Sequence, residues 1–237
     1  MMVQKVEHIT KLDDNKTCDV YYLEIQIDDV QSHASNLISL ITENSWINQL
    51  DPIAKVSFET KVNNTANALT SIFTDQSESS TVKDEFGEYM ISIDSAQSLK
   101  DKLQHFVFPL AELWKEKVTN NHGFDFHTQT PDKLLAFGEA KYVSSGNAYG
   151  RAAEQVVRFI SDEEKKDLGD LIFLKSLGAD ESAIDSCLNQ RKKDFILGFS
   201  VNSENSELIK KNALQNENVL KLIDEAETLF LVGVHVI

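Results

Sequence analysis

Residues 123–142 read GFDFHTQTPDKLLAFGEAKY and predict a β-hairpin. The segments 123–127 and 135–142 are rich in apolar and aromatic residues, as paired strands are. Between them lies Thr130-Pro131-Asp132-Lys133, which has the composition of a tight turn because proline fixes one backbone angle and aspartate favours a bend. A loop with an odd number of residues, such as Pro131 to Lys133, would set the register of the two strands.

The hairpin is expected to bring two carboxylates and a lysine together. Glu139 and Lys141 are two residues apart, so they project from one face of their strand, and Asp125 and His127 share a face of the preceding strand. With an odd loop, position 125 lies opposite position 139, and the β-carbons of Asp125 and Glu139 come within roughly 5 Å. Two like charges this close are unfavourable unless a cation lies between them. The spacing therefore predicts a site for a divalent metal ion.

Such a site has the groups needed to hydrolyse a phosphodiester. Asp125 and Glu139 would hold one or two Mg²⁺ ions, with Mn²⁺ as a substitute and the backbone carbonyl of Ala140 as a further ligand. The metal would polarise the phosphate and lower the pKa of a bound water. Lys141 would orient or deprotonate that water, or stabilise negative charge at phosphorus. The alternative is an exposed strand pair with a surface salt bridge, worth ~0–1 kcal/mol and without function.

The composition is that of a soluble globular protein. The 237 residues are 41% hydrophobic and 26% charged, which fits a single domain spanning 1–237. Cys18 and Cys187 are too few for a disulfide framework or a cysteine zinc site. No apolar run approaches the roughly 18 residues of a membrane span, and Met1 to Asp14 lacks the apolar core of a signal peptide. A cytoplasmic location away from membranes is expected.

The net charge of −15 limits how the chain could meet nucleic acid. Proteins that hold nucleic acid alone usually have a basic surface, because phosphate neutralisation supplies most of the affinity. Either this chain does not bind nucleic acid, or another protein delivers the polymer to it. The sequence contains no GxxxxGK[ST] loop and no GxSxG elbow, which argues against an ATPase and a serine hydrolase.

Elsewhere the apolar pattern predicts further strands and helices. Strands are expected at 18–28, 53–62, 195–201 and 229–237. Helices are expected at about 29–48, 81–106, 110–118, 149–160 and 206–227, with short helices within 162–192. The helix over 81–106 is expected to begin with a capping box of Thr81 and Asp84, and residues 75–80 are expected to form an exposed loop. This order predicts an α/β fold, a mixed central β-sheet flanked by helices.

Three motifs occur in a fixed order between about residues 81 and 160. They are Phe86-Gly87-Glu88 in the long helix, Gly123-Phe124-Asp125-Phe126-His127, and Gly138-Glu139-Ala140-Lys141. A glycine–hydrophobic–aspartate strand followed by a Glu-x-Lys strand and a helix resembles the PD-(D/E)xK nuclease superfamily. The set of three resembles the HamA-like nuclease subunit of Hachiman antiphage defence systems. One departure is Phe124, which stands where the superfamily pattern has proline.

The resemblance implies a restriction-endonuclease-like core and a metal-dependent deoxyribonuclease. It also implies a superfamily 2 helicase partner that binds and moves the DNA and restrains the nuclease, which would account for the acidic charge. Two alternatives stay open. The chain could be a non-enzymatic acidic adaptor that binds a basic nucleic-acid-processing partner, or a metal-dependent enzyme acting on a nucleotide or RNA.

The resemblance adds residues to the predicted site. It points to Glu88 as a further metal contact, although the apolar stripe of its helix leaves Glu88 away from the buried face and Glu85 nearer its edge. Gln155 lies on the helix after the hairpin, where related nucleases often place a glutamine. Arg151 and Arg158 share that helix and could contact a phosphate. A zinc centre at His122 and His127 is disfavoured because these residues are expected on opposite faces.

Overall fold

The computed structural model of the protein describes residues 1–9, 18–50, 52–115, 123–161 and 163–236. Within these residues, strands form one seven-stranded mixed sheet. The strands are β1 (Met2–Ile9), β2 (Asp19–Ile27), β3 (Phe106–Val107), β4 (Phe126–Gln129), β5 (Leu135–Lys141), β6 (Asp194–Val201) and β7 (Thr228–Val236).

The sheet has the strand order β1-β2-β7-β6-β5-β4-β3. The four central strands β2, β7, β6 and β5 are parallel to one another. At one end β1 lies antiparallel to β2, and at the other β4 lies antiparallel to β5 and β3 antiparallel to β4. Every residue of β6 is buried, because a parallel strand in the middle of such a sheet is covered on both faces.

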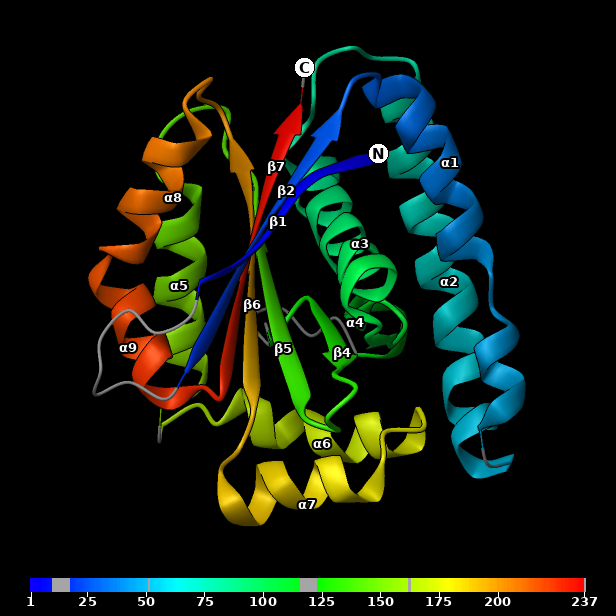
Figure 1. Ribbon diagram of the computed structural model, residues 1–237. Helices are drawn as coiled ribbons and strands as arrows, with labels where there is room; N and C mark the ends of the chain where they lie inside the picture. Colours follow the sequence, from blue (N-terminus) through cyan, green and yellow to red (C-terminus); the bar gives the residue numbers. More distant parts are fainter. Residues whose placement is uncertain (10–17, 51, 116–122, 162, 237) are drawn as a thin grey trace.

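Helices cover both faces of the sheet. They are α1 (Val30–Thr42), α2 (Pro52–Ser77), α3 (Asp84–Leu103), α4 (Ala111–Trp114), α5 (Ala148–Phe159), α6 (Lys166–Ser176), α7 (Glu181–Gln190), α8 (Ser206–Leu214) and α9 (Glu217–Glu225), with a 3₁₀ turn, η1, at Ser45–Gln49. Figure 1 shows α1, α2 and α3 on one side of the sheet and α5, α8 and α9 on the other. Helices α6 and α7 cross one end of it.

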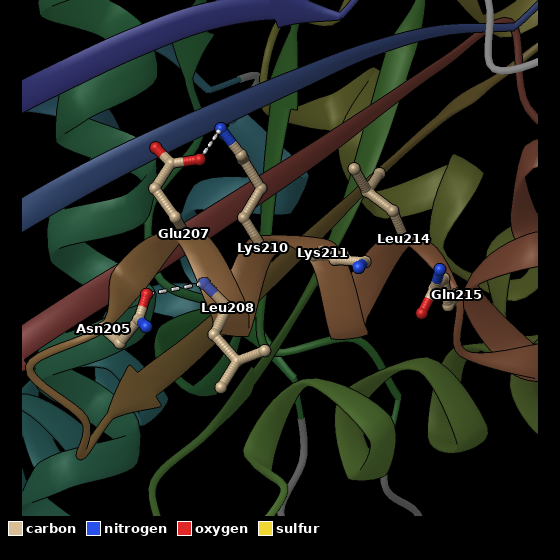
Figure 2. Close-up of a pocket in the computed structure, with 7 residues that line it drawn as sticks. All are labelled: Asn205, Glu207, Leu208, Lys210, Lys211, Leu214 and Gln215. Atoms are coloured by element: carbon tan, nitrogen blue, oxygen red, sulfur yellow. Dashed lines mark hydrogen bonds and ion pairs between the residues drawn. The ribbon is translucent and has the colours of Figure 1, made fainter.

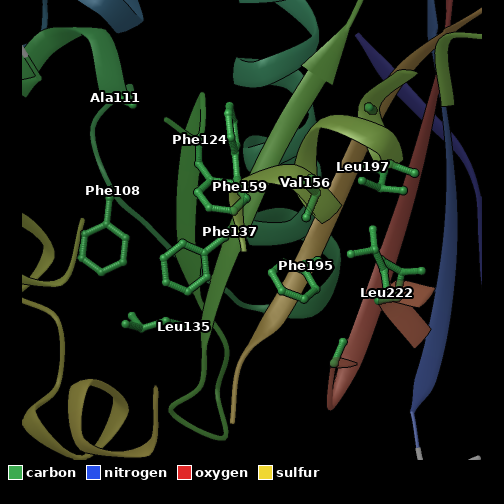
Figure 3. Close-up of a cluster of buried hydrophobic side chains, with 14 of the residues drawn as sticks. Phe108, Ala111, Phe124, Leu135, Phe137, Val156, Phe159, Phe195, Leu197 and Leu222 are labelled. Atoms are coloured by element: carbon green, nitrogen blue, oxygen red, sulfur yellow. The ribbon is translucent and has the colours of Figure 1, made fainter. Parts of the chain in front are cut away.

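Each face of the sheet has its own hydrophobic core. On the α5 side, Phe124 packs against Phe137 with ring centroids 5.1 Å apart and against Phe159 at 5.3 Å (Figure 3). On the α3 side, the rings of Phe73 of α2 and Phe86 of α3 pack in a T-shaped pair with their centroids 5.0 Å apart. The hairpin strands β4 and β5 therefore lie between two packed layers, which fixes their position.

Two glycines let α3 lie close to the sheet. A β-carbon at Gly87 would come within 2.3 Å of the Tyr142 ring, and one at Gly198 within 2.7 Å of Ser95 Oγ. A larger residue at either position would push α3 away from β5 or β6. The glycine of the Phe86-Gly87-Glu88 motif is thus required by packing, and it brings Glu88 toward β5.

The predicted mixed α/β fold is confirmed, but the expected strand over 53–62 is wrong. These residues belong to α2, and apolar side chains recur at helical spacing only when the longer segment is considered. The buried apolar residues of that segment, among the side chains that the structure describes, are Phe58, Val62, Ala66, Leu69 and Phe73. Residues 75–77, expected in a loop, also belong to α2. Strand β1 was not predicted.

Several predicted helix boundaries also differ. Helix α3 begins at Asp84 without the predicted capping box, and the amide of Lys83 donates instead to Gln76 Oε1 at 2.9 Å. The expected helix over 206–227 is two helices, because the Asn216 side chain caps α9 and so starts a new helix. The expected helix over 29–48 ends at Thr42 and is followed by η1. Residues 116–118 of the expected helix over 110–118 lie outside the described residues.

We expect Gly138→Ala to lower the free energy of unfolding by about 1–3 kcal/mol, the usual cost of overpacking a core. The new β-carbon would lie 2.5 Å from the Phe126 ring. Urea denaturation of both proteins measures the difference. The matched control is Gly169→Ala in α6, where a β-carbon meets nothing within 4 Å and helix propensity predicts a gain of up to about 1 kcal/mol. Equal stability of Gly138→Ala and the natural protein would contradict this packing argument.

Candidate functional site

The hairpin forms in the predicted register. Phe126 pairs with Gly138 and Gln129 with Leu135, which leaves the odd loop 131–133. The amide of Thr130 donates to the carbonyl of Leu134 at 2.9 Å, and Lys133 closes the turn in the left-handed region with φ 61°.

Asp125 lies where β4 and β5 separate. Regular pairing begins at Phe126, which lies opposite Gly138, and Asp125 directly precedes it in the chain. The amide of Asp125 donates to the carbonyl of Gly138 at 2.9 Å, and its carboxylate accepts the amide of Ala140 at 2.8 Å. The Asp125 side chain thus takes the place of a backbone hydrogen bond between the two strands. This bond directs the Asp125 carboxylate onto the edge of β5.

Glu139 is a fully buried carboxylate beside Asp125. Lys141 Nζ lies 2.9 Å from Oε1 of Glu139, but neither oxygen of Glu139 accepts a well-aligned hydrogen bond from the described residues. Burial raises the pKa of Glu139 well above its usual range, and the negative charge of Asp125 raises it further against the opposing effect of Lys141. A buried carboxylate with an unsatisfied oxygen is costly and suits a cation.

Lys141 is held as an ammonium by the surrounding carboxylates. Burial alone would lower its pKa, but Glu139, Asp125 and Glu88 outweigh that effect and raise it. A lysine with a raised pKa does not take a proton from water near neutral pH. Of the roles predicted for Lys141, this environment therefore favours charge stabilisation and orientation over deprotonation.

Glu88 is the carboxylate of α3 that faces the hairpin. Its Oε1 lies 3.5 Å from Lys141 Nζ, and burial, followed by the charge of Asp125, raises its pKa. Glu85 is exposed on the same helix. The apolar stripe had placed Glu88 away from the buried face and Glu85 nearer its edge, and that expectation is wrong. Gly87 lets this part of α3 approach β5 at Tyr142, next to Lys141.

The other predicted residues lie outside this cluster. Gln155 is half-buried on α5 and has no hydrogen bond to the cluster within the described part of the chain. Arg151 and Arg158 are exposed on α5, and Arg158 pairs with Glu164 at 3.2 Å. His127 is buried and bonds to Asp170 of α6 at 2.9 Å rather than facing Asp125. His122 lies outside the described residues.

The donor set suits a hard cation that shares its coordination with substrate. Among the residues that the structure describes, no three His, Cys, Asp or Glu side chains come close enough to hold a metal ion. Mg²⁺ is usually bound by one or two carboxylates together with water and substrate phosphates, so Asp125 and Glu139 are sufficient as protein ligands. The amide of Ala140 points at Asp125, and in an extended strand the carbonyl of the same residue points to the same edge. The buried Glu139 carboxylate therefore fits a cation, with the Ala140 carbonyl as the third protein donor.

The hollow on α8 has no part in this cluster. It contains Glu207 and Lys210, which form an ion pair at 2.6 Å (Figure 2). Lys5 of β1 also bonds to Glu207, and Lys210 bonds to Glu7 of β1. Its charged groups thus join α8 to the edge of the sheet.

Comparison of the chain with protein-family models gives no match, and comparison with curated proteins gives none either. No helix in the described ranges combines the length and the apolar composition needed to cross a lipid bilayer.

We expect Glu139→Gln to stabilise the protein increasingly as the pH rises. Because the folded-state pKa of Glu139 is raised, the protonated carboxyl favours the fold below about pH 4.5, and this contribution is lost as the pH rises through the folded-state pKa. The glutamine variant avoids that loss. Its melting temperature should exceed that of the natural protein at pH 8 by about 2–4 °C for each kcal/mol recovered. Thermal unfolding from pH 5 to pH 8 measures the difference.

The control is Glu85→Gln, which neutralises an exposed carboxylate on the neighbouring helix. It should give no gain that grows with pH. A gain for Glu139→Gln that is constant from pH 5 to pH 8 would show that Glu139 carries no raised pKa.

Proposed function

We propose that the protein is a metal-dependent DNA endonuclease, the nuclease effector of a bacterial antiphage defence complex that a superfamily 2 helicase controls. The observation that carries this proposal is the buried Glu139 carboxylate, which lies beside Asp125 and Lys141 where two strands separate. Buried like charges are tolerated when a function requires them, and hydrolysis of a phosphodiester by a metal ion uses this set.

Each side chain has a separate task in the proposed reaction. Asp125 and Glu139 would hold the cation, which when bound supplies a polarised phosphate and a water of lowered pKa. Lys141, kept protonated by its neighbours, would stabilise the charge that develops on the phosphate oxygens. Glu88 would keep Lys141 oriented and contact the metal or its water shell.

The motif order supports a restriction-endonuclease-like core as part of the proposal. Helix α3 carries Glu88, the β4–β5 hairpin carries the Asp and Glu-x-Lys residues, and α5 follows with Gln155. Helices α3 and α5 pack on opposite faces of the hairpin (Figure 1). Gln155 has no bond to the cluster in this state, so its role would need bound DNA.

The proposal predicts a metal response that depends on Asp125. Mn²⁺ or Mg²⁺ should raise the melting temperature of the natural protein, because a ligand that binds only the folded state stabilises it. Asp125→Asn should lose this response, because the variant lacks the Asp125 carboxylate that would hold the cation. The same carboxylate accepts the Ala140 amide at the edge of β5. Thermal unfolding of the natural protein and of the variant, with Mn²⁺ and with Ca²⁺ as a second hard cation, measures the two responses. Equal shifts for the two proteins would exclude Asp125 as a ligand.

DNA cleavage should depend on Glu139 and Lys141 and not on exposed charged residues elsewhere on the surface. We expect Glu139→Ala and Lys141→Ala to lower the rate of DNA cleavage in Mg²⁺ at least ~10²–10³-fold, as loss of a transition-state donor does. The fold should survive. Control variants are Lys175→Ala, an exposed lysine of α6, and Glu85→Gln, whereas Glu88→Gln should give an intermediate loss. Cleavage by Glu139→Ala at the natural rate would overturn the site.

Charge supports the partner part of the proposal. A chain of net charge −15 should bind DNA weakly by itself and rely on a helicase to deliver it. We expect fluorescence anisotropy with an oligonucleotide, at about physiological salt, to show tight binding only when the partner is added. Tight, salt-sensitive binding by the isolated chain would contradict delivery by a partner.

The second candidate is a non-enzymatic acidic adaptor for a basic nucleic-acid-processing partner. It is favoured by the same net charge and by the lack of three metal-binding side chains in one group among the described residues. The metal scan separates the two candidates. An adaptor would show no stabilisation by Mn²⁺, and Glu139→Gln would still bind the partner.

A further inference from the structure

The segment that carries Asp125 is not a regular strand. Phe124 and His127 both pack against Phe137, with ring centroids at 5.1 and 5.4 Å. Residues three apart face opposite sides of a regular strand, so the backbone must depart from alternation between them. Phe126 packs into the core on the other face. The orientation of Asp125 therefore depends on what holds the two ends of this irregular segment.

Lys115, which follows α4, holds the first end. Its Nζ donates to the carbonyl of Phe124 at 2.8 Å and to Asp170 Oδ2 at 2.8 Å. The Phe124 carbonyl belongs to the peptide group that bears the Asp125 amide. A β-carbon at Gly123 would lie 2.7 Å from Nζ of Lys115, so the glycine of this motif leaves room for the lysine.

Asp170 of α6 holds the second end. The oxygen that accepts Lys115 lies 2.9 Å from His127 Nε2, so one carboxylate oxygen ties positions 124 and 127 together. Burial opposes ionisation of Asp170, but His127 and Lys115 outweigh it and lower its pKa. Burial lowers the pKa of His127, and its Nδ1 has no hydrogen-bond partner in the described part of the chain. We therefore assign the neutral ring with its proton on Nε2.

We propose that Lys115 and Asp170 are positioning residues. Through their bonds to the Phe124 carbonyl and to His127 they hold the segment from Phe124 to His127, and so keep the Asp125 carboxylate against the edge of β5. The positioning follows from the contacts alone. Its effect on metal binding and cutting rests on the proposed nuclease function. Groups that orient a metal ligand typically change metal affinity or activity ~10–100-fold when they are removed.

The chain offers a matched control on the same helix. Asp167 of α6 pairs with Lys193, and both side chains are buried. This pair has the same residue types as Lys115–Asp170, and among the described residues neither member forms a hydrogen bond or ion pair with the segment that carries Asp125. Loss of either lysine leaves an aspartate of α6 without its cation, so both losses should destabilise the fold.

The experiment compares Lys115→Met with Lys193→Met in the full chain. Methionine keeps the length of the lysine stem and removes its donors. We expect both variants to melt below the natural protein. Only Lys115→Met should speed hydrogen exchange at the Asp125 amide, which donates to Gly138, weaken the apparent Mn²⁺ affinity ~10–100-fold and lower kcat more than it raises KM. Lys115→Arg retains the charge and hydrogen-bond donors, so it should show smaller changes in hydrogen exchange, Mn²⁺ affinity and kcat than Lys115→Met.

The outcomes separate the two proposals. If Lys115→Met keeps natural exchange at Asp125 and a natural Mn²⁺ response, or if Lys193→Met changes both equally, the positioning role is wrong. If the natural protein neither binds Mn²⁺ nor cuts DNA while Lys115→Met speeds exchange at Asp125, the positioning role stands and the nuclease proposal fails. Asp170→Asn, which keeps the volume of the side chain, replaces Lys115→Met in this comparison if the latter does not fold.

Discussion

The charge cluster around buried Glu139 is the constraint on which the site depends. A carboxylate removed from water beside Asp125 and offset by Lys141 is an unfavourable arrangement in a resting protein. Three features hold it in place: the hairpin register, the bond from the Ala140 amide to Asp125 and the packed cores on both faces of the sheet. The surrounding fold thus stabilises a site that is itself unstable, as is common where a protein binds a ligand or performs chemistry.

Three glycines connect the packing of the fold to the charged residues. Gly87 precedes Glu88 and accommodates Tyr142, Gly138 precedes Glu139 and accommodates Phe126, and Gly123 lies two residues before Asp125 and accommodates Lys115. In each case a neighbouring side chain occupies the space of a β-carbon. Each motif therefore combines a charged residue with a glycine that allows a neighbouring side chain to approach closely.

The sequence was most informative where local rules suffice. Alternation along the strands and an odd loop predicted the register of the hairpin, in which Phe126 lies opposite Gly138, and continuous apolar runs predicted β6 and β7. It failed where tertiary contacts dominate. The side of α3 that Glu88 faces depends on Gly87 and Tyr142, which helical periodicity does not describe. The irregular backbone at Asp125 depends on Asp170, which is distant in sequence. A window confined to 53–62 could not distinguish a strand from the start of α2.

The position of β7 has a consequence for folding of the sheet. This strand comes last in the sequence, yet it lies in the interior of the sheet between β2 and β6, where Asp19 pairs with Thr228. A nascent chain that stops before Thr228 has β2 and β6 but nothing to join them. Pairings between such remote residues form slowly, because a large loop must close first. A truncation before Thr228 would therefore leave the sheet divided between β2 and β6.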